Sequence, residues 1–176
     1  MSDSATDKRF YGKYRGIVFN NVDPELRGRI MCIVPDVTGP VPTSWCEACA
    51  PLAGPTGAQM GAYFVPPMGA GVWIEFEQGD PGHPIFTGCR FARGDVPVLA
   101  LAGLPISPNI CLQTAAQNTI VISDLPGPTG GIMLKSTTGA TLIVNDTGIY
   151  IQNGKGAMIT LVGPVVDINT GALTVT

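Results

Sequence analysis

A period-two pattern and a tight turn lie together in residues 67–88, PMGAGVWIEFEQGDPGHPIFTG. Val72, Ile74 and Phe76 recur at every second position, which is typical of a β-strand with one buried face. Residues 79–82 are Gly-Asp-Pro-Gly, and such residues favour a turn because they adopt backbone angles that strands do not supply. Residues 85–88 predict a short return strand. The whole segment therefore predicts a β-hairpin.

Two further strands are predicted upstream, at residues 11–19 and 29–34, separated by a turn at 20–28 and ended by Pro35. Residues 36–71 are rich in proline and glycine, which favours long loops. We expect Trp45 and residues 63–65 to pin these loops to a core. A five-stranded OB-fold barrel is the most economical arrangement.

The last third of the chain is repetitive. Residues 131–136, 148–153 and 165–170 form one series of apolar segments at a spacing of seventeen, and a second series lies between them at 118–124, 140–144, 157–161 and 172–176. Residues 125–130 form an inserted loop. The preceding segment, 91–117, is interrupted by glycine and proline and is predicted to be a connector. The repeat predicts seven short strands.

Seven such strands cannot make a core alone, because each carries only two or three branched apolar residues. Either the chain coils on itself, or identical chains stack their apolar faces around a shared axis. A single-chain β-helix needs longer coils, whereas alternating short strands fit an intertwined trimer, which also hides the sheet edges. The predicted trimer core consists of Ile132, Leu134, Leu142, Val144, Ile149, Ile151, Ile159, Leu161, Val166 and Ile168.

The composition excludes several functions. Apolar residues make up 45% of the chain, so it is not disordered. A net charge of −3 with scattered Lys and Arg disfavours nucleic acid as a partner. No apolar run reaches the roughly 20 residues that a membrane helix needs, and the polar first residues do not form a signal peptide. Five cysteines are an odd number and do not predict a disulfide framework.

The candidate catalytic residues have simpler explanations. His83 is the only histidine, so no triad or histidine-rich metal site can form within one chain, and we expect an exposed turn residue. Asp80 fits a turn role beside Pro81. Glu75 and Glu77 share the predicted strand, but solvated charge is the expected role for them, because paired catalytic carboxylates need a cleft. We expect no catalytic residues.

No metal or cofactor site is predicted either. Cys46 and Cys49 form a C-x-x-C pair, but a zinc site needs a second pair at suitable spacing, and Cys32, Cys89 and Cys111 do not provide one. The glycine-rich segments 55–57 and 127–131 lack the Lys-Ser/Thr of a phosphate loop.

The hairpin fits the pattern P-x-G-x-x-V-W-I-E-F-x-x-G-D-P-x-x-P-I-x-x-G. Further matching elements occur upstream in the same order: Gly16-Ile17-Val18, Asp23-Pro24, Gly28-Arg29-Ile30, Val34-Pro35 and Trp45. Residues 14–90 thus resemble the OB-fold domain of phage baseplate spike proteins and of VgrG, the spike of the type VI secretion system. Residues from 118 onward resemble the repetitive stalk of that family, which implies a threefold stalk.

The resemblance and the residue patterns together predict an all-β homotrimer. An N-terminal arm (1–13) precedes an OB-fold barrel (14–90), a connector (91–117) and a C-terminal intertwined triple-stranded β-helix spike, or needle (118–176). Some relatives carry a domain that degrades the cell wall at the junction, but residues 91–117 are too few to hold one.

The expected function is that of a non-enzymatic central spike of a contractile tail or injection-system baseplate, which pierces the target envelope. We expect a baseplate hub protein at the OB and N-terminal end and a PAAR-like tip protein at the C-terminal end. The strand pattern reaches the last residue without a capping segment, so the expected docking residues are Leu173, Thr174, Val175 and Thr176. The protein would be made in the cytoplasm and assembled into a phage tail or phage-like particle.

Two alternatives predict other properties. An OB-fold binding module for an oligosaccharide or single-stranded nucleic acid would show exposed aromatic and basic residues and no obligate trimer. A cell-wall hydrolase spike would require a catalytic insert.

Overall fold

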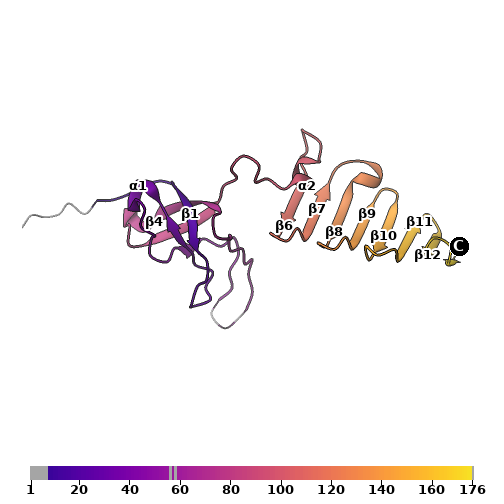
Figure 1. The fold of residues 1–176 in the computed structure, drawn as a ribbon, viewed down its shortest axis with the longest axis horizontal. Helices are drawn as coiled ribbons and strands as arrows, with labels where there is room; N and C mark the ends of the chain where they lie inside the picture. Colours follow the sequence, from indigo (N-terminus) through magenta and orange to yellow (C-terminus); the bar gives the residue numbers. More distant parts are fainter. Residues whose placement is uncertain (1–7, 56, 58, 176) are drawn as a thin grey trace, which may run out of the picture. The chain divides into compact units, whose positions relative to one another are not determined.

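The computed structural model describes residues 8–55, 57 and 59–175, which form two compact units divided at Gly94. Nearly all regular structure is β, which confirms the predicted fold class (Figure 1). Residues 1–7 of the predicted N-terminal arm, and Thr176 of the predicted docking residues, lie outside the described residues. None of the described helices is long and apolar enough to span a membrane.

The N-terminal unit contains a five-stranded sheet in the order β2-β1-β4-β5-β3. Its elements are β1 (Tyr14–Asn20), β2 (Met31–Ile33), α1 (Pro35–Thr38), β3 (Glu47–Ala48), β4 (Gly71–Phe76), η1 (Glu77–Gly79) and β5 (Pro84–Cys89). The predicted hairpin is the antiparallel pair β4–β5. Bridges between Ile30 and Cys46 and between Ile33 and Pro42 join the β2 edge to the segment that leads into β3, so the sheet curls back on itself.

The barrel interior is filled by the residues that the period-two pattern of β4 predicts. Val72 and Ile74 are fully buried, and Phe76 is nearly so. They pack with Val18, Ile30, Cys32, Val34, Cys46 and Phe86 in one cluster. Burial of a branched aliphatic side chain contributes about 1.5–3 kcal/mol, so this cluster is the main source of stability in the unit.

The prediction that residues 63–65 pin the long loops to the core is wrong for two of the three residues. Tyr63 and Phe64 are 70% and 64% exposed, and only Val65 packs against the core. The loop is instead attached by its backbone, because Gly69 donates to the Val18 carbonyl at 2.9 Å and Val18 donates to that of Ala70 at 3.0 Å. Residues 63 and 64 lie outside any strand, so nothing turns their side chains inward.

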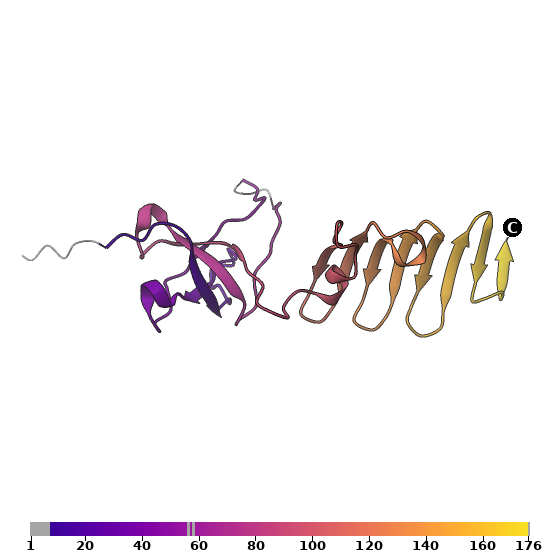
Figure 2. The same ribbon diagram turned by 90° about the horizontal axis from the view of Figure 1, so that it is seen from above.

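The C-terminal unit is a single eight-stranded meander in which each strand pairs antiparallel with the next one in the chain (Figures 1 and 2). Its elements are α2 (Val98–Leu101), β6 (Ile110–Gln113), β7 (Thr119–Ser123), η2 (Gly127–Thr129), β8 (Gly131–Lys135), β9 (Thr141–Asn145), β10 (Gly148–Gln152), β11 (Met158–Val162), β12 (Val165–Ile168) and β13 (Leu173–Val175). Strands β7–β13 coincide with the seven predicted segments, although β9 and β11 each extend one residue beyond theirs, to Asn145 and Val162.

The segment expected to be only a connector, 91–117, contains α2 and β6. Strand β6 pairs with β7 along its whole length, from Ile110 opposite Ile122 to Gln113 opposite Thr119. Its four residues are too short for a period-two signal and lie outside the repeat. These four residues form a strand because their backbone pairs with β7.

Candidate interface on the C-terminal sheet

The strand register aligns apolar residues into two unbroken rows on one face of the eight-stranded sheet. We call these rows the aliphatic ladders. The first consists of Ile110, Ile122, Ile132, Val144, Ile149, Leu161, Val166 and Val175. The second consists of Leu112, Ile120, Leu134, Leu142, Ile151, Ile159, Ile168 and Leu173. Every strand contributes one residue to each ladder.

The ladders are uncovered in the single chain. None of their residues is buried, and Ile110 is 64% exposed. Monomeric soluble proteins rarely expose a continuous apolar surface of this extent, because its burial is the main driving force for folding and association. A face with these properties is an interaction surface.

The opposite face of the sheet is partly covered by the chain itself. Val121 points to that face and is only 4% exposed. The segment around α2 contacts β6, and the segment around η2 contacts β9 (Figure 2). The Asn109 amide donates to the Leu99 carbonyl at 2.8 Å, and the Gly127 backbone N–H donates to the Asp146 carboxylate at 3.1 Å. The apolar ladders are therefore the less protected of the two faces.

All ten residues predicted for the trimer core lie on the ladders. The seventeen-residue repeat brings the two alternating apolar positions of each strand to the same face of the sheet. Their burial in a trimer stays a prediction. Two of the predicted docking residues, Leu173 and Val175, also lie on the ladders, in β13. The predicted core does not include four further ladder residues, Ile110, Leu112, Ile120 and Ile122, although each pair shows the same two-residue spacing as the ten.

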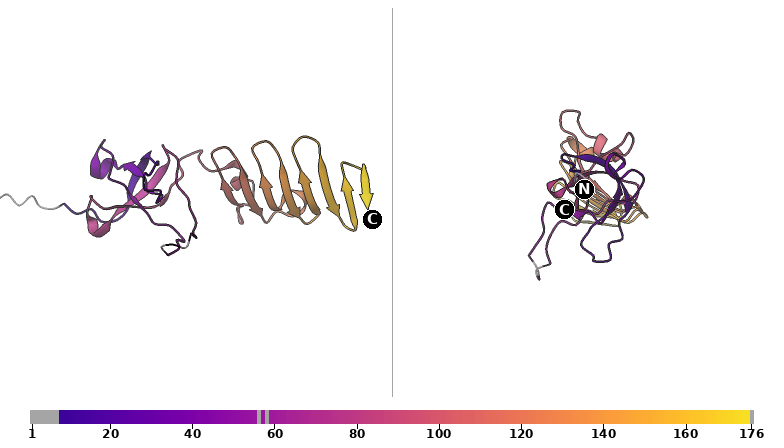
Figure 3. Two further views of the ribbon diagram at one scale, coloured as in Figure 1. Left: turned by 90° about the horizontal axis from the view of Figure 1, so that it is seen from below. Right: turned by 90° about the vertical axis from the view of Figure 1, so that its left-hand side faces the viewer.

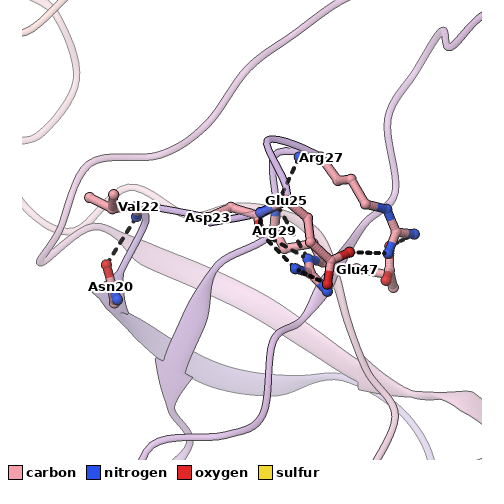
Figure 4. A network of polar contacts seen from close by, with 7 residues as sticks. All are labelled: Asn20, Val22, Asp23, Glu25, Arg27, Arg29 and Glu47. Atoms are coloured by element: carbon pink, nitrogen blue, oxygen red, sulfur yellow. Dashed lines mark hydrogen bonds and ion pairs between the residues drawn. The ribbon is translucent and has the colours of Figure 1, made fainter.

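A polar cluster in the N-terminal unit organises the turn between β1 and β2 (Figure 4). The buried Asp23 carboxylate accepts hydrogen bonds from the backbone N–H groups of Glu25, Arg27 and Arg29, at 2.8–3.2 Å. It also accepts hydrogen bonds from two nitrogens of the Arg29 guanidinium, from Nε at 3.2 Å and from Nη2 at 2.7 Å. The Arg29 guanidinium holds the pKa of Asp23 well below its usual range, helped by the backbone donors.

Arg29 is fully engaged within this cluster. Its guanidinium lies 3.0 Å from the Glu25 carboxylate and 5.6 Å from the centre of the Trp45 ring. Sequence analysis identified the turn but not the ion pair, because Asp-Pro and Gly alone account for a turn. The network stabilises the conformation of the turn, since its hydrogen-bond donors and acceptors pair with one another.

His83 and Asp80 form a surface pair in the β4–β5 turn. His83 Nδ1 lies 3.3 Å from Asp80 Oδ2, and the imidazole is largely exposed. The Gly82 backbone N–H donates to Asp80 at 2.8 Å and, with His83, lowers the pKa of this carboxylate. An open hollow of about 240 Å³ beside them is lined by Arg9, Glu77, Gln78, Asp80 and His83.

The acidic residues of the β4–β5 hairpin occupy different local positions. Glu75 is part of β4, and its carboxylate lies 3.1 Å from the Lys13 ammonium. Glu77 lies beyond the end of the strand, in η1. Asp80 has the predicted turn role, because it accepts a hydrogen bond from the backbone two residues ahead.

The cysteines of the C-x-x-C segment lie in different environments. Cys46 is fully buried in the barrel, and its thiol lies 3.3 Å from Thr43 Oγ1, whereas Cys49 is exposed. Cys32 is the buried cysteine that interacts with Cys46, and hydrogen bonding to Cys46, together with burial, raises the pKa of Cys32. In the part of the chain that the structure describes, all five cysteines are free and no three His, Cys, Asp or Glu side chains gather as metal ligands.

Comparison with known protein families agrees with this architecture. Residues 14–91 match the family described as the type VI secretion system/phage-baseplate injector OB domain. Residues 109–174, which run from the residue before β6 into β13, match the phage baseplate V C-terminal trimerisation domain. No curated protein matches the chain.

The trimerisation domain supports a homotrimer and coincides with the sheet that carries the uncovered ladders. An injector OB domain followed by this trimerisation domain is the organisation of a baseplate spike, and the chain belongs to the phage baseplate V family of spike proteins.

Proposed function

We propose that this protein is the non-enzymatic central spike of a contractile tail or injection-system baseplate, that it pierces the target cell envelope, and that it carries a separate tip protein. The supporting observation is the pair of uninterrupted aliphatic ladders, which run through eight consecutive strands. Three such faces turned toward one axis make a dry, interlocked interior. Close-packed interiors have low compressibility, so the trimer transmits force along its axis.

The piercing role is tested with assembled particles that carry Ile151→Asp, which places a charge on a ladder. Gln152→Asp is the matched control, because the neighbouring residue in β10 has the opposite orientation. Sheath contraction is scored by electron microscopy and envelope puncture by depolarisation of target cells. We expect Ile151→Asp particles to contract without depolarising cells, and Gln152→Asp particles to behave as wild type. The proposal would be contradicted if the Ile151→Asp spike no longer trimerises and its particles still depolarise cells as wild-type particles do.

The tip protein is proposed to dock on β13, an edge strand of the sheet. Edge strands present unpaired backbone groups, and Leu173 and Val175 are more than half exposed. A partner that resembles the PAAR cone would cover both. Leu173→Asp/Val175→Asp is expected to abolish co-purification of the small tip protein of the same particle, whereas Thr170→Asp is expected to retain it. Full retention by the double variant would contradict docking at this strand.

A hub protein is proposed to bind at the OB and N-terminal end, and the complex to assemble in a phage tail or phage-like particle. The absence of enzymatic activity is part of the proposal. Baseplate spikes act mechanically, and Asp80 has a local structural role, because it accepts a hydrogen bond from the Gly82 backbone N–H in the β4–β5 turn. Release of soluble fragments from purified peptidoglycan by the trimer, and its loss in Asp80→Asn, would contradict this part.

A further inference from the structure

A long uncharged loop projects from the barrel between β3 and β4. Residues 48–74 contain no Asp, Glu, Lys, Arg or His, although the chain carries 23 charged residues elsewhere. We call residues 49–55, 57 and 59–66 the arm. It extends away from the five-stranded sheet in both views of Figure 3. Interfaces between proteins are depleted in charge and enriched in aromatic residues and methionine, which is the composition found here.

The arm is a folded hairpin. Ala53 and Gly61 form a bridge, Gly54 donates to the Met60 carbonyl at 2.8 Å, and Ala62 donates to that of Leu52 at 2.9 Å. These bonds fix the backbone while the side chains of Leu52, Met60, Tyr63 and Phe64 stay more than half exposed. The arm therefore presents a preformed apolar surface that its own barrel does not cover.

A second uncovered apolar surface lies on the outside of the same barrel. We call it the barrel face, and it consists of Ile17 and Phe19 on β1 with Ile33 and Gly71 opposite Ile17 on the two neighbouring strands. Ile17 and Phe19 are 45% and 52% exposed. An arm cannot easily fold back onto its own barrel face, because its root is already bonded to β1 through Gly69 and to Asn21 through Pro66.

The barrel face also carries an unsatisfied donor. The Arg90 side chain lies over Gly71, where a Cβ would come within 3.0–3.2 Å of it. Its Nε is buried and has no hydrogen-bond partner among the described residues. A buried donor without a partner carries a desolvation cost.

We propose that the arm of one protomer packs on the barrel face of the next protomer in the trimer. The two surfaces are different patches of the same chain, so the contact is heterologous and closes into a ring when three copies are present. The C-terminal trimerisation domain supplies the three copies, and the contact continues that interface into the OB domains. The inference rests on the homotrimer and is independent of the piercing role.

The contact is tested by cysteine cross-linking in the full chain. Cys49, Cys89 and Cys111 are first replaced by serine, while the buried Cys32 and Cys46 are retained. Met60→Cys and Phe19→Cys are then introduced into separate, differently tagged chains, which are mixed to form heterotrimers and treated with a short bismaleimide. We expect a covalent dimer that carries both tags, together with loss of the corresponding monomer bands. Because the cysteines lie on different chains, only an intermolecular contact produces this band.

Val41→Cys replaces Phe19→Cys as the control, because Val41 is exposed but lies outside the barrel face. It is expected to give no mixed dimer. Addition of Phe64→Ser to the arm is expected to lower the yield of the Met60–Phe19 product several-fold without loss of the trimer. Absence of the mixed dimer from a trimer verified by light scattering would overturn the inference, and so would equal yields from Val41 and Phe19. Arm cross-links that appear only with the hub protein would show that the hub is the occupant. Failure to form any trimer would instead contradict the assembly on which the proposed function depends.

Discussion

The Asp23 carboxylate gives the stability of the N-terminal unit a dependence on pH. It is buried, it accepts from three backbone N–H groups, and it pairs with Arg29. Its pKa is lowered in the folded state, so the unfolded chain binds the proton more tightly than the folded chain does. The ionised form therefore stabilises the fold above the unfolded pKa, and this contribution is lost as the pH falls toward the folded pKa.

We predict that Asp23→Asn lowers the midpoint of urea unfolding at neutral pH and flattens its dependence on pH in the acid range. The wild-type midpoint should fall steadily below about pH 4, where an unfolded Asp begins to take up its proton. The measurement is equilibrium urea unfolding followed by tryptophan fluorescence, at several pH values. Asp36→Asn, on the surface of α1, is the control and is expected to retain the wild-type pH profile. Identical acid profiles for wild type and Asp23→Asn would refute the role given to Asp23.

Glycine acts at the same scale in the hairpin turns of the C-terminal sheet. Gly131 has φ +81°, and a Cβ at this position would lie 2.1 Å from the Val144 carbonyl oxygen of the neighbouring strand. Gly163 also has positive φ, +56°, but no atom lies within 4 Å of the position of its Cβ. Substitution by alanine at Gly163 therefore tests the cost of the backbone conformation alone, and at Gly131 it adds the cost of steric overlap with β9.

Gly163→Ala is expected to destabilise the sheet by about 1–2 kcal/mol, the cost of a left-handed conformation for an L-residue. Gly131→Ala is expected to cost clearly more, because β8 must also move away from β9. Thermal unfolding followed by circular dichroism measures both. Equal losses of stability would show that the overlap at Gly131 relaxes without cost.

At the scale of the element, the five-residue strand β11 carries apolar residues on both faces of the sheet. Ile159 lies on a ladder and Val162 points to the opposite face, and in the single chain their exposed fractions are similar, 37% and 45%. The single chain therefore gives little reason for the two residues to differ. Packing of the ladder face against the other two copies, as proposed, would bury Ile159 and leave Val162 exposed.

We predict that Ile159→Ala destabilises the trimer by about 2–5 kcal/mol per site, the usual cost when a buried isoleucine is truncated. Val162→Ala should change stability by no more than about 0.5 kcal/mol, as expected for a surface residue. The measurement is the guanidinium concentration at which trimers dissociate. A larger effect at Val162 than at Ile159 would show that the opposite face is the one that packs.

At the scale of the whole molecule, the homotrimer follows from a surface that one chain cannot bury. Both ladders run across all eight strands, and the proposed packing in a trimer would remove them from water. The interface is apolar, so its strength should depend little on ionic strength, since salt screens charges and does not weaken apolar burial.

We predict a particle of three times the 18.3 kDa chain mass in size-exclusion chromatography with light scattering. The trimer should persist from low to high salt. A stable species with the mass of one chain would favour the alternative of a monomeric OB-fold binding module over a spike.

The elements that depend on local patterns could be predicted from the sequence alone. The β4–β5 hairpin follows from period-two alternation and a Gly-Asp-Pro-Gly turn. The seven strands β7–β13 follow from the seventeen-residue repeat, and the repeat also places the ten predicted core residues on one face, because side chains in a strand alternate with a strict period of two.

Tertiary structure decided the features that depend on residues distant in the chain. The bridge from Ile30 to Cys46 that curls the sheet, the recruitment of β6 from the expected connector and the pairing of Asp23 with Arg29 are examples. The outward orientation of Tyr63 and Phe64 is another. In each case a short segment has no preference strong enough to fix its conformation. Its place is set by the backbone partners and packing surfaces that the folded chain brings to it.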